Sequence, residues 1–218
     1  MAEPTLEVHP LTPDRWDDLA VLFDRPGDAR GCWCMYWRVR GSEFDRLGGR
    51  GARAAFKQVV ETGPPPGLLA YRDGRPVGWC AVAPRDAYPR ILRSRVARPM
   101  EADPACWATV CFYVARSERR GGIAAALLDA AVEFAAANGA EAVEGYPKDA
   151  QGGRRHANEM FVGSVSMFLA AGFEEVGRRA PTRPIMRRRL PRRGPGNPGG
   201  VPRSISGRGG PAGPAGSR

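Results

Sequence analysis

Long apolar segments and a leader-like start are both missing from this sequence. No apolar run approaches the roughly 20 residues that a helix needs to cross a bilayer, and the opening Met1-Ala2-Glu3-Pro4 lacks the basic-then-apolar order of a secretory signal. We therefore expect a cytoplasmic protein with no membrane partner. The 218 residues, 43% of them hydrophobic, suffice for one well-buried domain and are too few for two full-sized ones.

Acidic residues are absent after Glu175. The formal charge of +10 comes from the 11 arginines beyond that point, because residues 1–175 hold 22 basic against 23 acidic groups. A nucleic-acid binder would spread its basic residues over a domain face, so nucleic acid is not expected as the main partner. Residues 191–218 contain 15 Gly or Pro and predict a disordered basic tail after a domain at 1–190. An arm attracted to RNA or membrane is the alternative for this tail.

A CxxC motif and a nearby histidine are also lacking, which argues against a metal. The five cysteines are an odd number, and in a reducing compartment they are most simply free, buried thiols. The pair Cys32 and Cys34 could ligate a metal only together with Cys80 or His156. We expect no metal site.

Periodicity predicts alternating strands and helices. Thr12 and Pro13 open the first helix, Gly48-Gly49 interrupts the second, and Asp73-Gly74 joins a hairpin. The segment 85–98 is a short helix or an ordered loop. The predicted strands are 6–9, 68–72, 76–82, 107–114, 142–146, 173–177 and 184–189, and the predicted helices are 13–23, a region ending near Thr62, 122–138 and 164–171. This order predicts an α/β fold, a mixed sheet covered by helices.

A glycine pair lies at the start of the clearest helix. Gly121-Gly122 follows the strand that ends at Val114, and a helix start presents backbone N–H groups and the positive end of the macrodipole. Arg119 and Arg120 add positive charge, so a phosphate-bearing cofactor is expected here. The sequence lacks both the P-loop order and a GxGxxG motif with its acidic residue.

The remaining pattern resembles the GNAT N-acetyltransferase family, whose motif is Arg/Gln-x-x-Gly-x-Gly/Ala. Arg119, Gly122 and Ala124 occupy its three fixed positions, while 170–176 resembles the family's Gly-Phe junction and 69–82 its hairpin. The resemblance implies a GNAT fold with splayed central strands and acetyl-CoA as co-substrate. It implies a cofactor site made of Phe112, Tyr113, Val114, Arg119, Arg120, Gly121, Gly122, Ile123 and Ala124.

The same resemblance implies an attack of a neutral amine on the thioester, with a base and an acid nearby. Glu144 is the expected base, with an exposed strand carboxylate as the alternative. The family's usual acidic tyrosine is replaced by Phe168, and its frequent asparagine by Phe161, so Tyr146 is the expected acid. An acyl-enzyme on Cys111 is not favoured, because no histidine lies near it in sequence.

The acceptor is expected to be a small-molecule amine. Trp33, Tyr36, Trp37 and Tyr88 would line its pocket, or form a small satellite core. Inward-facing arginines would suit an acidic acceptor, the candidates being Arg38, Arg85, Arg90 and Arg93. Two alternatives stay open: a catalytically silent module that binds acyl-CoA and regulates a partner, and an enzyme that acetylates a protein or tRNA. The sequence leaves a homodimer open.

Overall fold

The computed structural model describes residues 5–24, 31–149 and 161–191. Apart from Pro191, the predicted tail at 191–218 lies outside these residues, as does His156. None of the described helices is long and apolar enough to span a membrane.

One seven-stranded sheet organises the chain, in the order β1-β2-β3-β4-β5-β7-β6. Neighbouring strands are antiparallel except β4 and β5, which are parallel. The strands are β1 Leu6–Pro10, β2 Gly67–Arg72, β3 Arg75–Pro84, β4 Cys106–Val114, β5 Ala142–Gly145, β6 Glu174–Ala180 and β7 Arg183–Arg189. The helices are α1 Trp16–Phe23, α2 Gly41–Thr62, α3 Pro89–Leu92, α4 Ile123–Ala137 and α5 Val165–Ala170. The predicted mixed α/β sheet is confirmed.

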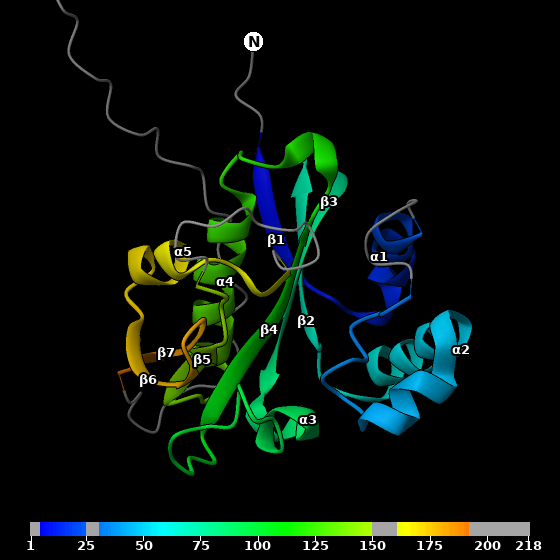
Figure 1. Ribbon diagram of the computed structural model, residues 1–218. Coiled ribbons are helices and arrows are strands. Elements are labelled where there is room, and N and C mark those ends of the chain that lie inside the picture. The colour runs from blue at the N-terminus through cyan, green and yellow to red at the C-terminus, as the bar shows by residue number, and fades with distance from the viewer. Residues whose placement is uncertain (1–4, 25–30, 150–160, 192–218) are drawn as a thin grey trace, which may run out of the picture.

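Helices cover both faces of the sheet and define two cores (Figure 1). On one face α1 and α2 bury Phe23 and Phe56 against Trp79 of β3, while on the other α4 buries a continuous stripe that includes Leu127 and Ala131. The stripe recurs at i, i+4 because a helix repeats every 3.6 residues. The central strands are therefore apolar on both sides, as the sequence of β4 predicts.

Local turn chemistry agrees with the sequence at most positions. Asp73 and Gly74 both have positive φ, 49° and 73°, as a type I′ hairpin turn requires. Gly48 interrupts α2 with a φ of 58°. Residues 85–98 resolve into a 3₁₀ turn at Arg85–Ala87 followed by α3. Tyr146 lies just beyond β5 rather than inside it.

The two parallel strands separate after a short paired segment. Their pairing runs only from Cys106↔Ala142 to Thr109↔Gly145, while β4 continues to Val114. The pairing of β3 with β4 jumps from Ala81↔Cys111 to Val82↔Thr109, which leaves Val110 as a bulge. The far half of β4 is thus not paired with β5, and both cavities described below lie beside it.

Phe168 occupies the position where the family's tyrosine was expected, and it is a core residue. It is fully buried and packs edge-on against Phe112 and Phe173, with ring centroids 6.1 and 5.0 Å away. Gly145 makes room for this ring, since a Cβ at that position would lie 2.1 Å from it. Phe168 therefore supports the point at which the strands separate.

Candidate functional site

The first of the two cavities beside the far half of β4, which we call the helix-end cavity, has a volume of about 390 Å³ and lies where β4 leads into α4. Its walls are backbone and side chains of the strand end, the connecting turn and the first helical turn. The lining residues are Phe112, Val114, Glu118, Arg119, Arg120, Gly122, Ile123, Ala124, Ala125 and Phe161. All but two of the predicted cofactor residues are among them.

The other two, Tyr113 and Gly121, do not line the helix-end cavity. Successive side chains of a strand point to opposite faces, so Tyr113 faces away from the cavity that Phe112 and Val114 line. Gly121 lies instead against the guanidinium of Arg72, 3.4 Å from where its Cβ would be. Strand alternation is a signal in the sequence that separates Tyr113 from its neighbours.

The turn before α4 is held in a conformation that presents backbone N–H groups. Arg120 and Gly122 have positive φ, 67° and 77°, and Nε of Arg119 donates to the carbonyl oxygen of Val114 at 3.2 Å. Among the described residues, no side chain caps the N-terminal end of α4. The N–H groups of its first turn, residues 123–125, therefore have no acceptor within the helix and point toward the cavity end.

The charge balance of this cavity favours an anion. Glu118 is its single acidic lining residue among those described, and its Oε2 lies 2.9 Å from Nη1 of Arg72. The pair compensates the carboxylate, so Arg119, Arg120 and the helix end set the sign of the local potential. Glycine backbone, uncapped N–H groups and two guanidinium groups are the chemistry that binds a pyrophosphate.

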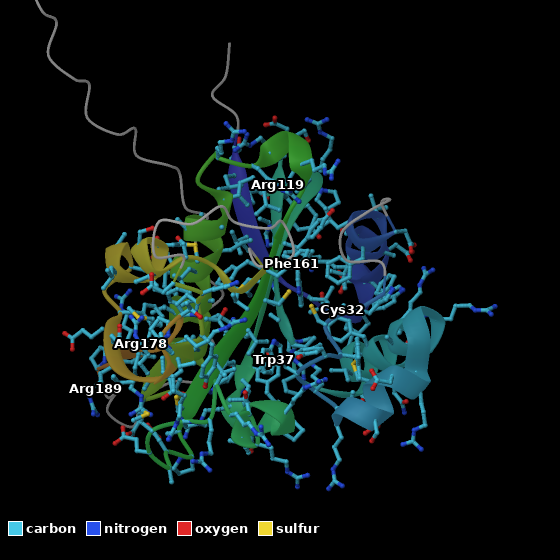
Figure 2. The ribbon with its side chains drawn as sticks, viewed as in Figure 1. Cys32, Trp37, Arg119, Phe161, Arg178 and Arg189 are labelled. Carbon is cyan, nitrogen blue, oxygen red and sulfur yellow. The ribbon has the colours of Figure 1, made fainter. Side chains whose placement is uncertain are left out.

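The second cavity, which we call the aromatic cavity, has a volume of about 490 Å³ and lies on the other face of β4. Val110, Cys111 and Tyr113 form its floor. The other lining residues come from α1, the segment 31–37, α3 and the chain after it, the residue after β5, residues 161–162 and β7; they are Phe23, Cys32, Cys34, Tyr36, Trp37, Arg90, Arg93, Ser94, Val96, Ala97, Tyr146, Phe161, Val162, Arg183 and Pro184. Phe161 is shared with the helix-end cavity, and its ring is stacked on Tyr113 at 6.4 Å. Figure 2 shows Phe161 between Arg119 on one side and Trp37 on the other.

The four aromatic residues predicted to contact the acceptor divide between cavity and core. Tyr36 and Trp37 line the aromatic cavity, with ring centroids 5.0 Å apart. Trp33 is 2% exposed and stacks on Trp16 in the core, and Tyr88 is fully buried beneath the guanidinium of Arg38. The pocket and the core that the sequence offered as alternatives thus each account for two of the four residues.

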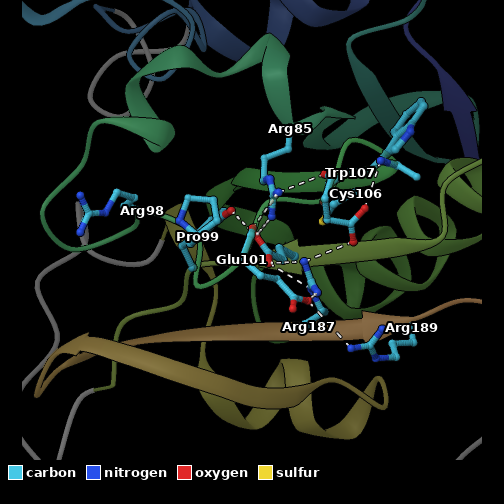
Figure 3. Close-up of polar contacts among 12 residues, drawn as sticks. Arg85, Arg98, Pro99, Glu101, Cys106, Trp107, Arg187 and Arg189 are labelled. Atoms are coloured by element: carbon cyan, nitrogen blue, oxygen red, sulfur yellow. Dashed lines mark hydrogen bonds and ion pairs between the residues drawn. The ribbon is translucent and has the colours of Figure 1, made fainter.

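Glu144 is fully buried and bonded through both carboxylate oxygens. Its Oε2 accepts from Nη1 of Arg85 at 3.0 Å and from the hydroxyl of Tyr146 at 2.7 Å. Its Oε1 accepts from Nε of Arg187 at 3.1 Å, and Arg187 also pairs with Glu101. Arg85 comes from the turn after β3 and Arg187 from β7, and the two side chains lie close together (Figure 3). The alternative of an exposed strand carboxylate is therefore wrong.

Tyr146 connects this buried cluster to the aromatic cavity. It lines the cavity while donating its hydroxyl proton to Glu144, which itself lines neither cavity. Burial, together with the charge of Glu144, raises the pKa of Tyr146 well above its ordinary value. The predicted base and acid are thus one hydrogen-bonded pair, and their catalytic roles stay predictions.

Three of the five free cysteines line the aromatic cavity. Nε1 of Trp79 lies 3.0 Å from Sγ of Cys34. A hydrogen bond with Cys111 lowers the pKa of Cys34 and raises that of Cys111, while burial raises the pKa of Cys32 to about 11. Among the described residues, no three His, Cys, Asp or Glu side chains gather in a way that could hold a metal.

Two contributors to these cavities are not evident from the sequence. Phe161 and Arg183 reach the aromatic cavity from parts of the chain far from β4, and only the three-dimensional packing brings them there. The sequence places Arg72 at the end of the first strand of the predicted hairpin. Its ion pair with Glu118 depends on long-range register and has no local signal.

Fold and site together define an α/β protein with an uncapped, arginine-flanked helix end beside an aromatic cavity. The profile of the GNAT acetyltransferase family matches residues 29–151, more than half of the chain. The chain belongs to the GNAT acetyltransferase family.

Solved structures share the fold at low sequence identity. The aminoglycoside acetyltransferase AAC(6')-Ib, in complex with coenzyme A, has a TM-score of 0.51 at 14% identity, covering 85% of this chain and 95% of that one. A diaminobutyrate acetyltransferase from Paenibacillus lautus, in complex with L-2,4-diaminobutyric acid and coenzyme A, has a TM-score of 0.49 at 13% identity, with coverage of 85% and 95%. A ribosomal-protein-alanine N-acetyltransferase from Brucella melitensis has a TM-score of 0.48 at 18% identity, with coverage of 84% and 99%. The comparison with curated protein sequences gave no match.

Proposed function

We propose that this protein transfers an acetyl group from acetyl-CoA to an amine of a small molecule by direct attack. The observation that carries the proposal is the pair of cavities on opposite faces of the free end of β4, which share Phe161 as a common wall. One cavity offers the chemistry for a pyrophosphate and the other a large apolar space. A two-substrate reaction needs both substrates to meet at one point.

In this proposal the helix-end cavity holds the co-substrate. The N–H groups of residues 123–125, with Arg119 and Arg120, bind the pyrophosphate. The half of β4 that no longer pairs with β5, around Phe112 and Val114, offers its backbone edge to the pantetheine arm. The thioester supplies the acyl group that is transferred.

The aromatic cavity holds the amine, and Tyr146 with Glu144 handles its proton. A phenol has one donor and two acceptor sites, so Tyr146 donates to Glu144 and can still accept a proton from an ammonium group. The ammonium proton passes to the Tyr146 oxygen as the phenol proton passes to Glu144, which leaves a neutral amine. After the amine attacks the thioester, Tyr146 gives its proton to the departing coenzyme A thiolate and regains one from Glu144, while the nitrogen releases its second proton to solvent. Glu144 thus acts through Tyr146, because it does not reach the cavity itself.

The experiment that tests this function measures coenzyme A binding and turnover separately on the full chain. We expect calorimetry to show saturable acetyl-CoA binding below about 1 mM, and a thiol-release assay to show turnover with some members of a panel of primary amines. No binding of coenzyme A at millimolar concentration would reject the proposal.

Two other results would select the alternatives. Tight binding with no thiol release from any amine would favour the silent acyl-CoA-binding module, for which the replacement of the family's tyrosine by buried Phe168 is the supporting observation. Activity on a protein or tRNA that falls sharply, with its salt dependence, on removal of residues 191–218 would favour a macromolecular acceptor.

A further inference from the structure

The aromatic cavity combines apolar walls with charged side chains that are all positive. Its lining includes Arg90, Arg93 and Arg183, which come from α3, the chain just after it, and β7. No Asp or Glu is among the described residues that line it. Two separate parts of the chain, the α3 segment and β7, therefore bring cationic groups to the same space.

These three arginines are uncompensated within the described residues. None of them forms an ion pair there, whereas Arg72, Arg85 and Arg178 elsewhere are all paired with carboxylates. Like charges that share a partly apolar space repel one another, and an anion entering it would relieve that repulsion. The cavity is therefore electrostatically prepared for a negative group.

Arg90 is also held in place before any ligand arrives. Its guanidinium lies 3.7 Å from the ring centroid of Tyr36, and its Nη1 donates to the Tyr36 carbonyl oxygen at 3.2 Å. The backbone N–H of Arg90 donates to the carbonyl oxygen of Trp37 at 3.3 Å. A guanidinium fixed in this way loses little conformational entropy when it binds a carboxylate.

The rest of the lining suits an apolar, planar body. Trp37, Phe23 and Val110 line the cavity, and the rings of Tyr113 and Phe161 lie nearly parallel, 10° apart. A volume of about 490 Å³ is in the range of sites that take small molecules.

We propose that the acceptor is an amine with an apolar, planar body that also carries a carboxylate, and that Arg93 and Arg183 help select it. The proposal rests on the proposed acetyltransferase function and names its substrate class. Polycationic amines are disfavoured, since they would bring further positive charge to three guanidinium groups that have no ion pair within the described residues.

The test compares matched pairs of amines that differ only in a carboxylate. Phenylalanine is compared with phenethylamine, tryptophan with tryptamine, and 4-(aminomethyl)benzoate with benzylamine, by kcat/KM in the thiol-release assay. We expect the carboxylated member to be preferred by at least about 10-fold in one or more pairs, the effect of one or two charge-assisted hydrogen bonds. Equal rates within each pair, or preference for the cationic members, would overturn the proposal.

Variants assign the preference to this cavity. Arg93→Gln and Arg183→Gln should each lower kcat/KM for the carboxylated amine about 10-fold, while leaving kcat/KM for the partner without a carboxylate and the Kd of coenzyme A within about twofold. Neither side chain has a hydrogen bond or ion pair within the described part of the chain, so folding should be unaffected. Arg95→Gln is the matched control, because Arg95 is an exposed neighbour that does not line the cavity.

The two proposals fail in different ways. If coenzyme A does not bind or no amine is acetylated, the acetyltransferase function is rejected. If coenzyme A binds and neutral or cationic amines are turned over faster, only the acceptor class is wrong. An equal loss of activity in the Arg95 variant would also contradict the role of Arg93 and Arg183.

Discussion

Tyr146 links a buried charge cluster to the space in which an acceptor amine would lie. Removing both guanidinium partners of a buried carboxylate would be strongly destabilising, and the cluster around Glu144 is complete on both oxygens. The one member that also reaches the aromatic cavity is the tyrosine. Any exchange of protons between that cavity and Glu144 therefore passes through the Tyr146 hydroxyl.

Replacing this hydroxyl tests the proton path. Tyr146→Phe should lower kcat by about 10²-fold or more, because general acid–base catalysis contributes about 10² to 10⁴, while the Kd of coenzyme A is unchanged. Steady-state kinetics and calorimetry on the same preparation measure the two effects. Loss of the hydrogen bond to Glu144 should cost about 1 kcal/mol of stability.

A second tyrosine in the same protein supplies the control. The Tyr71 hydroxyl also donates to a carboxylate at 2.7 Å, that of Asp18, but it lines neither the helix-end nor the aromatic cavity. Tyr71→Phe should therefore cost similar stability with kcat unchanged. Equal kcat values for Tyr146→Phe and the original protein would reduce Glu144 and Tyr146 to a structural pair.

At the scale of elements, α4 carries the same backbone conformation at its two ends with different surroundings. Gly122 precedes the helix with a φ of 77°, Gly139 follows it with a φ of 84°, and a Cβ at either position would have no atom within 4 Å. Gly122 borders the helix-end cavity, and Gly139 lies at the opposite end of the helix. Comparing the same substitution at the two glycines therefore separates the effect of backbone strain from the effect of ligand contact.

Leucine at each position should therefore have one shared and one distinct effect. Both Gly122→Leu and Gly139→Leu should lose about 1 to 2 kcal/mol of stability, the cost of a left-handed conformation in a residue with a Cβ. Only Gly122→Leu should weaken coenzyme A binding, by at least about 100-fold, because the added side chain fills the space where a phosphate would approach the backbone. Thermal unfolding and calorimetry measure these two quantities. Similar affinities for the two variants would argue against a phosphate site at this helix end.

Elements were predictable from the sequence where local chemistry determines them. The apolar stripe of α4, the Asp73-Gly74 turn and the break at Gly48 are each decided by residues within a few positions of one another, and each is observed. The helix-end cavity follows for the same reason, since its turn and helix start are contiguous in sequence.

Long-range packing decided the rest. Local sequence carries no sign that Glu144 would meet Arg187 across the β5–β7 pairing, and an exposed position was a reasonable alternative. The aromatic segment 31–37 was ambiguous because a pocket and a core need the same residues. Only the fold places Trp33 against Trp16 and leaves Trp37 at the cavity.

At the scale of the whole molecule, buried tyrosine and cysteine side chains that are neutral at physiological pH make the free energy of unfolding depend on pH in the alkaline range. Burial raises the pKa of Tyr88, of Tyr71 together with its bond to Asp18, and of Tyr146 together with the charge of Glu144. Burial likewise raises the pKa of Cys80 and Cys106 to about 12. In the unfolded chain these groups titrate near about 10 for tyrosine and about 8.5 for cysteine.

The sign of the effect follows from which state keeps its protons. Above about pH 8.5 the unfolded chain begins to lose thiol protons, and above about pH 10 phenol protons, while the folded protein retains both. The free energy of unfolding should therefore be flat with respect to these groups below about pH 8 and fall as pH rises, by up to about 1.4 kcal/mol per pH unit for each group.

Denaturant unfolding at a series of alkaline pH values measures this slope, and phenolate absorbance read beside far-ultraviolet circular dichroism shows when the tyrosines ionise. We expect the phenolate signal of Tyr71, Tyr88 and Tyr146 to appear only as the dichroism is lost, because ionising any of these phenols inside the core that they share would leave an unpaired buried charge. Tyr71→Phe should make the slope above about pH 10 shallower by one group. Full ionisation of these tyrosines with native dichroism intact would show that solvent reaches their hydroxyl groups. The burial of the Tyr146 hydroxyl against Glu144 would then be wrong.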